Sequence, residues 1–230
     1  YQIFDKSFIS DSYSCRNRKG THRGVLRLRT CIKRITRNYT RPAYALKCDV
    51  RKFFASIDHE ILSNILAKHI KDQDTLWLLG RIVSSFKIQK GKGLPLGNLT
   101  SQLLVNIYMN EFDQFVKHKL KAEYYIRYAD DFVIFSEDRK SLENLIPQIK
   151  TFLATKLKLS LHPDKVSIKT LASGVDFLGW VHFPHHRVLR TSTKRRMLKN
   201  LSVNKSKETK ASYLGMLRHG STYKLRQKLE

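Results

Sequence analysis

The segment from Tyr124 to Phe135 constrains the fold more than any other part of the chain. Two apolar, β-prone arms, Tyr-Tyr-Ile and Phe-Val-Ile-Phe, flank a short polar tip that contains Asp130 and Asp131. This pattern predicts an antiparallel hairpin. Adjacent like charges repel each other, and a tight turn alone would favour Asn-Gly or Asp-Gly. The hairpin therefore presents two carboxylates that turn formation does not explain.

Carboxylates fixed side by side suit a hard divalent cation, because Mg²⁺ takes oxygen ligands and keeps several of its waters. A third carboxylate, Asp49, stands near the end of a short predicted strand over residues 44–50. Metal ions held in this way stabilise the attacking and leaving oxygens of an in-line phosphoryl displacement. The alternative is a polar turn without ligands, which does not explain an Asp-Asp pair set between Tyr128 and an apolar strand. We therefore predict that Asp49, Asp130 and Asp131 form a metal site.

The remaining sequence mixes helical and strand patterns without alternating between them. Apolar residues at helical spacing predict helices over residues 23–35, 58–70, 77–86, 104–115 and 141–158. Pro147 lies inside the last of these and predicts a kink or a later helix start. Gly and Pro indicate a loop over residues 91–97, and short strands follow over residues 159–188. This order predicts an α+β fold rather than a doubly wound sheet.

The charge of the chain is concentrated at its two ends. Lys and Arg total 44 against 19 Asp and Glu, a net charge of +25. Residues 1–48 carry a net +10 and residues 186–230 a net +11, whereas residues 49–185 carry only +4. The alternatives are two solvated basic surfaces, a membrane surface or a nucleic acid. Because the chain carries two separate blocks that are both rich in Arg, we interpret them as surfaces that contact nucleic acid.

Several other classes of protein do not fit the sequence. The longest nearly apolar run, residues 103–109, is too short to span a bilayer, so we expect no membrane partner. The first residues lack the pattern of a signal peptide. Three cysteines without C-x-x-C spacing are typical of a reduced, intracellular protein, and we expect it to be cytoplasmic. The chain also lacks the phosphate-binding loop of nucleotide triphosphatases.

Four groups of residues resemble motifs of one enzyme family. Residues 128–131, Tyr-Ala-Asp-Asp, resemble the catalytic signature of reverse transcriptases. Residues 49–59 are similar to the first palm motif of the group II intron-like branch, and residues 177–180, Phe-Leu-Gly-Trp, to the hairpin that grips the primer. Residues 12–22 are similar to part of the fingers of this branch. The motifs follow the family's order across most of the chain.

One motif departs from the usual family pattern. Most reverse transcriptases carry Gln-Gly-x-x-x-Ser-Pro, whereas residues 96–102 read Leu-Gly-Asn-Leu-Thr-Ser-Gln. This version resembles the enzymes of diversity-generating retroelements, which copy a template RNA with errors at adenines. The resemblance therefore implies an error-prone reverse transcriptase of that type. A group II intron-type enzyme with a splicing role and a catalytically idle RNA-binding scaffold are the alternatives.

The resemblance implies a right-hand polymerase, with an antiparallel palm sheet backed by helices. We assign residues 1–45 to fingers that lack their N-terminal part. Residues 46–185 form the palm with the catalytic site and the primer grip, including a fingers-side insertion near residues 87–102. Residues 186–230 form a basic thumb segment.

The resemblance also assigns roles to individual residues. Asp49 and Asp130 hold two Mg²⁺ ions, for which Mn²⁺ can substitute, with a smaller contribution from Asp131. The Val50 carbonyl joins the metal on the nucleotide side. Phe54 excludes a ribose 2′-hydroxyl and so selects deoxynucleotides, although its position also fits plain core packing.

The remaining assignments concern the nucleotide and the primer. The other nucleotide-binding residues by resemblance are Arg16, Gly97, Ser101, Gln102 and Lys165. Solvated positions are the alternative for the basic residues, and an ordinary turn before a helix is the alternative for the glycine. The primer grip comprises Phe177, Leu178, Gly179 and Trp180. The Trp180 ring stacks on a base or is buried, and the sequence leaves both open.

The resemblance names partners as well. These are a template RNA, the RNA/DNA hybrid that forms during synthesis, and deoxynucleoside triphosphates. Retroelement enzymes of this type also work with a small basic accessory protein, a helical bundle. We expect the same partners for this chain.

Overall fold

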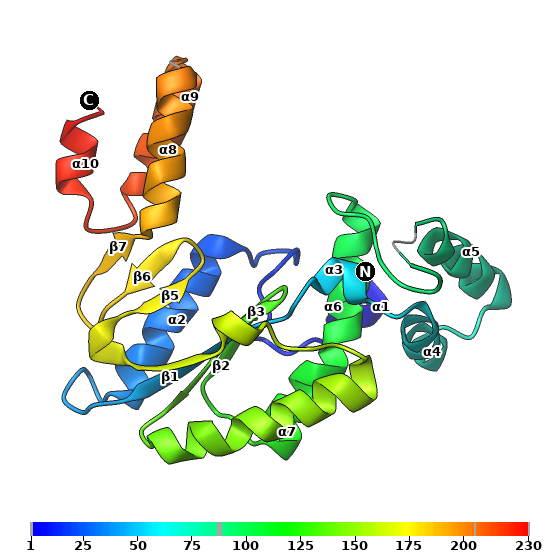
Figure 1. Ribbon diagram of the computed structural model, residues 1–230. Helices are drawn as coiled ribbons and strands as arrows, with labels where there is room; N and C mark the ends of the chain where they lie inside the picture. Colours follow the sequence, from blue (N-terminus) through cyan, green and yellow to red (C-terminus); the bar gives the residue numbers. More distant parts are fainter. Residues whose placement is uncertain (1, 87–88, 205, 230) are drawn as a thin grey trace.

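The acidic hairpin forms one side of a four-stranded antiparallel sheet in the computed structural model, which describes residues 2–86, 89–204 and 206–229 (Figure 1). The spatial order of the strands is β2-β3-β1-β4. Their bounds are β1 Tyr44–Asp49, β2 Tyr125–Tyr128, β3 Asp131–Ser136 and β4 Ser167–Thr170. The predicted hairpin and the predicted strand that ends near the third carboxylate are both confirmed.

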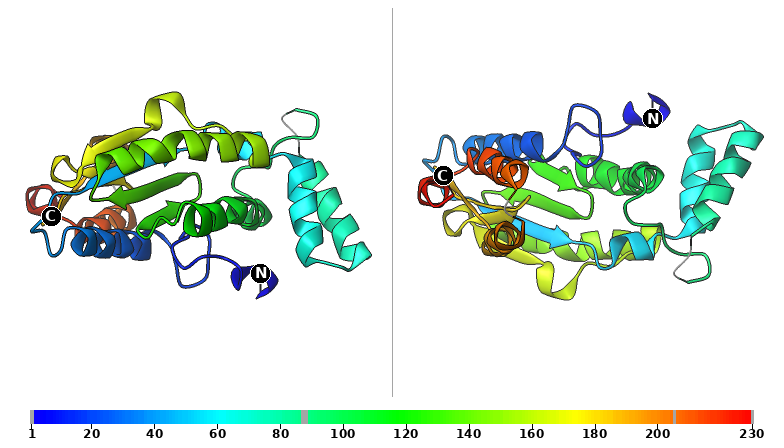
Figure 2. Two further views of the ribbon diagram at one scale, coloured as in Figure 1. Left: turned by 90° about the horizontal axis from the view of Figure 1, so that it is seen from below. Right: turned by 90° about the horizontal axis from the view of Figure 1, so that it is seen from above.

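Helices cover both faces of this sheet, because side chains alternate between the two faces along each strand. Leu46 and Cys48 of β1 share a hydrophobic core with α6 and α7, whereas Ala45 packs in a second cluster with α2. Figure 2 shows α2 and α7 on opposite sides of the sheet. The bounds of these helices are α2 Thr21–Ile35, α6 Leu99–Gln114 and α7 Arg139–Leu157. Lys47 and Asp49 lie on the same face as Ala45, two and four residues further along the strand.

Side-chain caps set where the longer helices begin. The Asp58 carboxylate accepts a hydrogen bond from the Ile61 amide at 3.1 Å, and Asp72 caps α5 in the same way. The cap explains why α5 starts earlier than the apolar pattern of residues 77–86 predicts. The helices of this region are α1 Gln2–Asp5, α3 Phe53–Ser56, α4 His59–His69 and α5 Gln73–Ser84. In Figure 1, α4 and α5 lie at the end of the molecule opposite α8, α9 and α10.

The two long helices also start before their predicted first residues. Asn98 caps α6, and Asp138 accepts hydrogen bonds from two amides at the start of α7. Pro147 lies inside α7, so it does not mark the start of that helix. A π-helical turn, Phe115–Lys119, extends α6 at its C-terminal end.

A second, three-stranded antiparallel sheet follows, in the order β5-β6-β7. Its strands are β5 Val175–Phe177, β6 Trp180–His182 and β7 Arg187–Leu189, and two 3-10 turns, η2 Pro163–Lys165 and η3 Leu171–Ser173, precede them. The β5–β6 turn uses Leu178 and Gly179, both in the left-handed region at φ 53° and 83°. Its tip packs on α2 at Gly24, where a Cβ would lie 2.9 Å from Leu178. A glycine in α2 therefore allows the second sheet to approach the helix.

The C-terminal helices stand on the second sheet and project from the rest of the molecule (Figure 1). They are α8 Thr191–Val203, α9 Lys207–Leu217 and α10 Tyr223–Gln227. A third hydrophobic cluster joins Trp180 to Met197 of α8 and Leu217 of α9. Gly220 lies against the Trp180 ring so closely that a Cβ there would overlap it.

The α+β class predicted from the sequence is confirmed, with antiparallel strands in both sheets. Within the described ranges, no helix is both long enough and apolar enough to cross a bilayer. The predicted insertion near residues 87–102 begins at residues 87–88, which lie outside the described residues. Residues 89–98 form a loop that leads into α6.

Candidate active site

The strand register brings the three predicted carboxylates to one end of the central sheet. Asp49 and Asp131 are direct partners across the β1–β3 pair. The Val50 amide donates a hydrogen bond to the Asp130 carbonyl at 3.2 Å. Residues from two distant parts of the chain therefore meet at the tip of the hairpin.

The turn between β2 and β3 has a strained backbone. Ala129 adopts φ 54°, in the left-handed region that costs a residue with a Cβ about 1–2 kcal/mol. Such strain persists only where surrounding contacts hold it in place, and it is common at functional sites. The Ala-Asp sequence at this turn is thus a local exception to ordinary hairpin chemistry, as the sequence pattern indicated.

Asp131 is a half-buried carboxylate, with 20% of its side chain exposed, and its set of partners is incomplete. Lys47 Nζ lies 3.4 Å from its Oδ2, whereas Oδ1 is buried without a hydrogen-bond partner. Burial raises the pKa of Asp131 to about 7; Lys47 opposes this shift, and Asp49 and Asp130 add to it. Burial, with a smaller contribution from Asp49, also raises the pKa of Asp130. Burial therefore disfavours the ionised forms of both Asp130 and Asp131.

The ammonium group of Lys165 lies beside Asp49, the carboxylate at the end of β1. Its Nζ is 3.2 Å and 3.1 Å from the two oxygens of Asp49, and about half of the lysine side chain is exposed. The family resemblance assigned Lys165 to nucleotide binding. The structure places it against Asp49, where an exposed cation can exchange partners.

The donor set fits a magnesium ion. Carboxylate oxygens are its preferred protein ligands, and Mg²⁺ usually takes only one or two carboxylates together with water and substrate phosphates. The unpartnered Oδ1 of Asp131 is a free acceptor at this point. Across residues 2–86, 89–204 and 206–229, no group of three or more His, Cys, Asp or Glu side chains is arranged to hold a metal ion by itself. An open, partly hydrated ion is the form that these residues fit.

A hollow of about 410 Å³ opens beside Asp49 and Asp131. Most of its other charged side chains are basic: Lys47, Lys165, Lys169 and Arg190. Three of these basic residues, all except Lys165, were not expected from the sequence. Lys47 could have been found from strand periodicity, because it lies two residues before Asp49 and shares its face. Arg190, which pairs with Asp176 of β5, comes from a distant segment and gave no local signal.

The predicted nucleotide-side residues lie around α3 and the start of α6. Phe53 is 3% exposed and belongs to the core, whereas Phe54 is half-buried beside it and packs against that core. Gly97 adopts φ 83° in an exposed turn, and nothing lies within 4 Å of the position of a Cβ. Ser101 is buried in the first turn of α6, and Gln102 is half-buried. The glycine therefore provides backbone conformation and leaves open space beside the turn.

Arg16 is engaged within the protein. Its guanidinium donates to Asp5 at 2.9 Å, to the Ile9 carbonyl at 2.6 Å and to the Ser12 carbonyl at 3.1 Å. Only 6% of its side chain is exposed. The structure thus gives the guanidinium a role in bracing the loop that precedes α2, and the sequence carried no signal for these partners.

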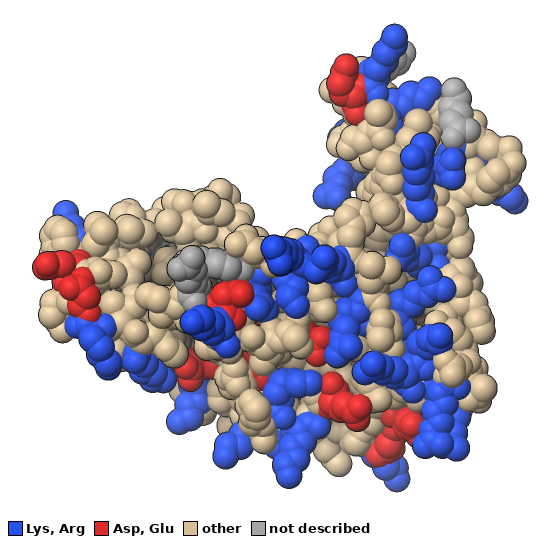
Figure 3. All heavy atoms as spheres, turned by 180° about the vertical axis from the view of Figure 1, so that it is seen from behind, with Lys and Arg blue, Asp and Glu red and all other residues tan. Residues whose placement is uncertain are grey.

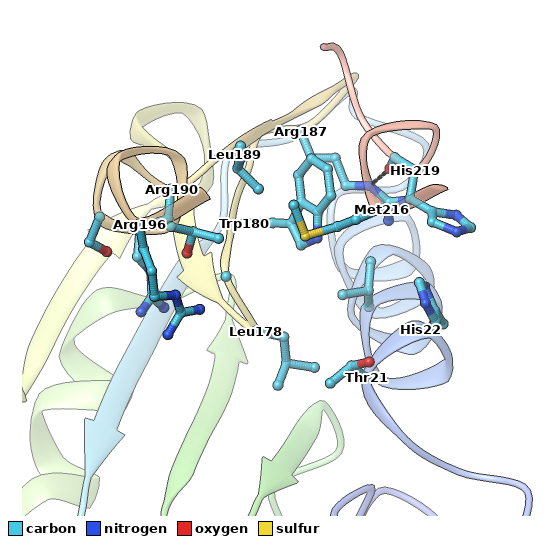
Figure 4. Close-up of a pocket in the computed structure, with 14 residues that line it drawn as sticks. Thr21, His22, Leu178, Trp180, Arg187, Leu189, Arg190, Arg196, Met216 and His219 are labelled. Atoms are coloured by element: carbon cyan, nitrogen blue, oxygen red, sulfur yellow. Dashed lines mark hydrogen bonds between the residues drawn. The ribbon is translucent and has the colours of Figure 1, made fainter. Parts of the chain in front are cut away.

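Three of the four predicted primer-grip residues, Leu178, Gly179 and Trp180, line a pocket of about 550 Å³ between α2, the second sheet and α8 (Figure 4). In Figure 4, Arg196 and His22 lie on opposite sides of Leu178. Phe177 is fully buried. The Trp180 ring is 6% exposed and has the Arg187 guanidinium 5.4 Å from its centroid, so it serves as a buried support rather than an open stacking surface.

His182, the last residue of β6, is buried at 3% exposure. Its Nε2 is 3.1 Å from the Phe177 carbonyl, a contact in which the ring nitrogen donates. Burial lowers the pKa of His182 to about 4, so the ring is neutral near pH 7.

Lys and Arg side chains are more widespread than Asp and Glu on the face of the molecule in Figure 3, from the main body to the projection formed by α8 to α10. The outline is hollowed between this projection and the rest of the protein. The two basic ends of the sequence therefore contribute to an extended surface suited to a polyanion.

Comparisons with known proteins agree with this arrangement. A family model described as "Reverse transcriptase (RNA-dependent DNA polymerase)" matches residues 2–216. Protein YkfC of Escherichia coli K12 is 25% identical over 260 residues, covering 94% of this chain and 65% of YkfC. The group II intron-encoded protein LtrA of Lactococcus lactis is 24% identical over 276 residues, covering 90% of this chain and 44% of LtrA. The chain thus spans less than two thirds of the length of either relative.

Two solved structures share the fold. Apo telomerase from Candida tropicalis has a TM-score of 0.62 at 14% identity, covering 93% of this chain and 43% of the telomerase. Telomerase from Candida albicans in complex with a TWJ fragment of telomeric RNA has a TM-score of 0.63 at 12% identity. The match covers 83% of this chain and 36% of the telomerase. At these identities the likeness concerns the fold alone.

Proposed function

The chain belongs to the reverse transcriptase (RNA-dependent DNA polymerase) family, and we propose that it synthesises DNA on an RNA template by two-metal nucleotidyl transfer. The observation that carries the proposal is the meeting of Asp49, Asp130 and Asp131 at one end of the sheet. The free Oδ1 of Asp131 and the basic hollow beside it add support.

In the proposed reaction, a primer 3′-hydroxyl attacks the α-phosphate of a deoxynucleoside triphosphate. A new P–O bond forms, the bond to the β-phosphate breaks, and pyrophosphate leaves while the hydroxyl proton passes to solvent. Asp49 and Asp130 would hold two Mg²⁺ ions, assisted by the Val50 carbonyl and Asp131, and Mn²⁺ can substitute. Bound ions supply charge stabilisation to the entering and leaving oxygens.

The chain's own residues have distinct tasks in this scheme. Lys47 favours the ionised form of Asp131, and the exposed Lys165 can leave Asp49 to meet the phosphates of the nucleotide. Phe54 limits space at the sugar 2′ position. Gly97, with Ser101 and Gln102, forms the nucleotide-side wall.

The tertiary arrangement also supports a division into fingers, palm and thumb, which we propose at residues 1–45, 46–185 and 186–230. The projecting helices α8 to α10 form the thumb (Figure 1). Phe177 to Trp180 then support the primer end at the junction of palm and thumb, with Leu178 and Gly179 lining the pocket. Template RNA and the RNA/DNA hybrid occupy the basic face of Figure 3.

We further propose that the enzyme is the error-prone type of diversity-generating retroelements, with a small basic helical-bundle protein as partner. The support is the sequence of residues 96–102 and the open space beside Gly97. The likeness to LtrA favours a second candidate, a group II intron-type reverse transcriptase.

Primer extension on an RNA template tests the activity. We expect Asp130→Ala to lower the rate of synthesis by at least about 100-fold, because a preorganised electrostatic partner of the reacting groups is lost. Asp74→Ala, an exposed acid on α5, is the matched control and should keep the wild-type rate. Undiminished synthesis by Asp130→Ala would rule out the proposed mechanism.

The same assay separates the two candidate types. The retroelement type predicts misincorporation concentrated opposite template adenines. Equal fidelity opposite all four template bases would favour the group II intron type instead.

A further inference from the structure

A buried arginine lies directly behind the acidic turn. Arg127, in β2, has a side chain that is 1% exposed. Its Nη1 donates a hydrogen bond to the carbonyl of Ala129, two residues later, at 2.9 Å. The residue that accepts this bond is the one with the strained φ of 54°.

The guanidinium is fixed by a fork-to-fork ion pair. Arg127 Nε donates to Asp113 Oδ1 at 2.7 Å, and Nη2 donates to Asp113 Oδ2 at 2.6 Å. The Tyr125 hydroxyl donates to the same Asp113 Oδ1 at 2.7 Å. Two parallel hydrogen bonds of this kind fix the orientation of the guanidinium and also balance its charge. The arginine therefore has a single orientation against α6.

The N-terminal segment completes the cage around Arg127. Nη2 also donates to the Ser12 hydroxyl at 3.0 Å. The Arg127 amide donates to the Asp11 carbonyl, and the Tyr13 amide donates to the Arg127 carbonyl, both at 3.0 Å. The arginine thus joins β2, α6 and the segment before α2 at one point beneath the turn.

These contacts hold the backbone of Asp130 on both sides. The Ala129 carbonyl, before Asp130, accepts from Arg127, and the Asp130 carbonyl, after it, accepts from the Val50 amide at 3.2 Å. With both flanking peptide groups fixed, the direction of the Asp130 side chain is limited to its own rotamers. Without the Arg127 donor, the strained Ala129 peptide is free to rotate towards a relaxed turn.

We infer that Arg127 is a positioning residue that aims the Asp130 carboxylate at the reacting groups by holding the Ala129 carbonyl. The inference rests on the proposed function and deepens it, because it names a residue outside the metal site that sets the geometry of that site. The Arg127 side chain is only 1% exposed, so in this inference it acts through the backbone that carries Asp130.

Two variants test this role in primer extension under steady-state conditions. Arg127→Lys keeps a positive charge for Asp113 but lacks the fork needed to reach Asp113 and Ala129 together. The double variant Arg127→Met with Asp113→Leu removes both buried charges and so preserves charge balance without the donor. Arg27→Lys is the matched control, because Arg27 forms a similar bidentate pair with Asp11 and does not contact the turn.

We expect both Arg127 variants to lower kcat by about 10- to 100-fold, since a displacement near 1 Å at a reacting group has effects of this size. The KM for the nucleotide should change less than about threefold, and the Mg²⁺ concentration for half-maximal activity should rise. The Arg27→Lys control should retain wild-type kcat and Mg²⁺ dependence. A purely structural role would lower the melting temperature and the active fraction but leave the Mg²⁺ dependence unchanged.

The outcomes separate this inference from the proposed function. An inactive wild type, or an active Asp130→Ala protein, would refute the proposed function itself. An active wild type together with folded Arg127 variants of wild-type kcat and Mg²⁺ dependence would refute the positioning role alone. Failure of both Arg127 variants to fold would assign the arginine to stability and would equally overturn the inference.

Discussion

Asp113 and Asp131 are both carboxylates withdrawn from solvent, yet the fold gives them opposite surroundings. Asp113 is fully buried and accepts hydrogen bonds from the Tyr125 hydroxyl and from two N–H groups of Arg127. Asp131 has one lysine at 3.4 Å and an oxygen without a hydrogen-bond partner. The difference distinguishes a carboxylate that supports the fold from one that is available to a ligand, because buried polar groups are ordinarily satisfied internally.

The largest expected effect comes from breaking the satisfied pair. Asp113→Asn leaves the Arg127 charge buried without its counter-ion, so we expect the free energy of unfolding to fall by about 3–5 kcal/mol. Urea unfolding at pH 7 measures the change. Asp164→Asn, at an exposed position, is the control and should stay within about 0.5 kcal/mol of the wild type. A loss of stability below about 1 kcal/mol for Asp113→Asn would show that Asp113 does not support the fold more than Asp131 does.

The buried imidazole of His182 shows how burial acts on a basic group, in contrast to the carboxylates Asp113 and Asp131. His182 is neutral because burial lowers its pKa to about 4, below its ordinary value of 6.5. The unfolded chain therefore binds a proton more readily, and stability should fall as the pH decreases from about 6.5 towards 4. From pH 7 to pH 5 we expect a loss of about 1–2 kcal/mol from this residue.

Urea unfolding at several pH values checks the His182 prediction. His182→Gln should flatten the profile over this interval, whereas His118→Gln, at an exposed position, should leave it unchanged. Profiles of equal slope for wild type and His182→Gln would contradict it.

The smallest expected effect has the opposite sign. Burial disfavours the ionised form of Asp131, whose pKa is raised to about 7. In metal-free buffer at pH 8, Asp131→Asn removes this buried charge, and we expect stability to rise by about 1 kcal/mol after the loss of the Lys47 contact is counted. Urea unfolding in the presence of a chelator measures it. A loss of stability like that of Asp113→Asn would show that Asp131 supports the fold after all.

Local patterns were enough to predict most of the elements. The alternation of the Tyr124–Phe135 arms predicted the hairpin, and the apolar spacing of α2, α4, α6 and α7 predicted those helices. Helix starts were less well predicted, because the caps Asp72, Asn98 and Asp138 precede the apolar pattern. Pro147 was no guide to the start of α7, since a capped first turn begins the helix upstream of it.

The residues of the candidate site also fall into those that local sequence predicted and those that only the structure brings together. The sequence identified Asp49, Asp130 and Asp131, because carboxylates at strand ends and turns carry a local signal. It gave no sign of Arg190 in the basic hollow or of the partners of Arg16, since those contacts depend on segments far apart in the chain.

The sequence by itself determined the α+β class, the acidic hairpin, the family resemblance and the unequal distribution of charge. Each of these depends on the order and spacing of neighbouring residues. Tertiary structure alone decided that Asp49 faces Asp131 across β1 and β3, that Trp180 is buried, and that Arg127 holds the Ala129 carbonyl. The physical reason is that burial, strand register and the pairing of charges are set by which distant segments pack together, and a local pattern does not contain that information.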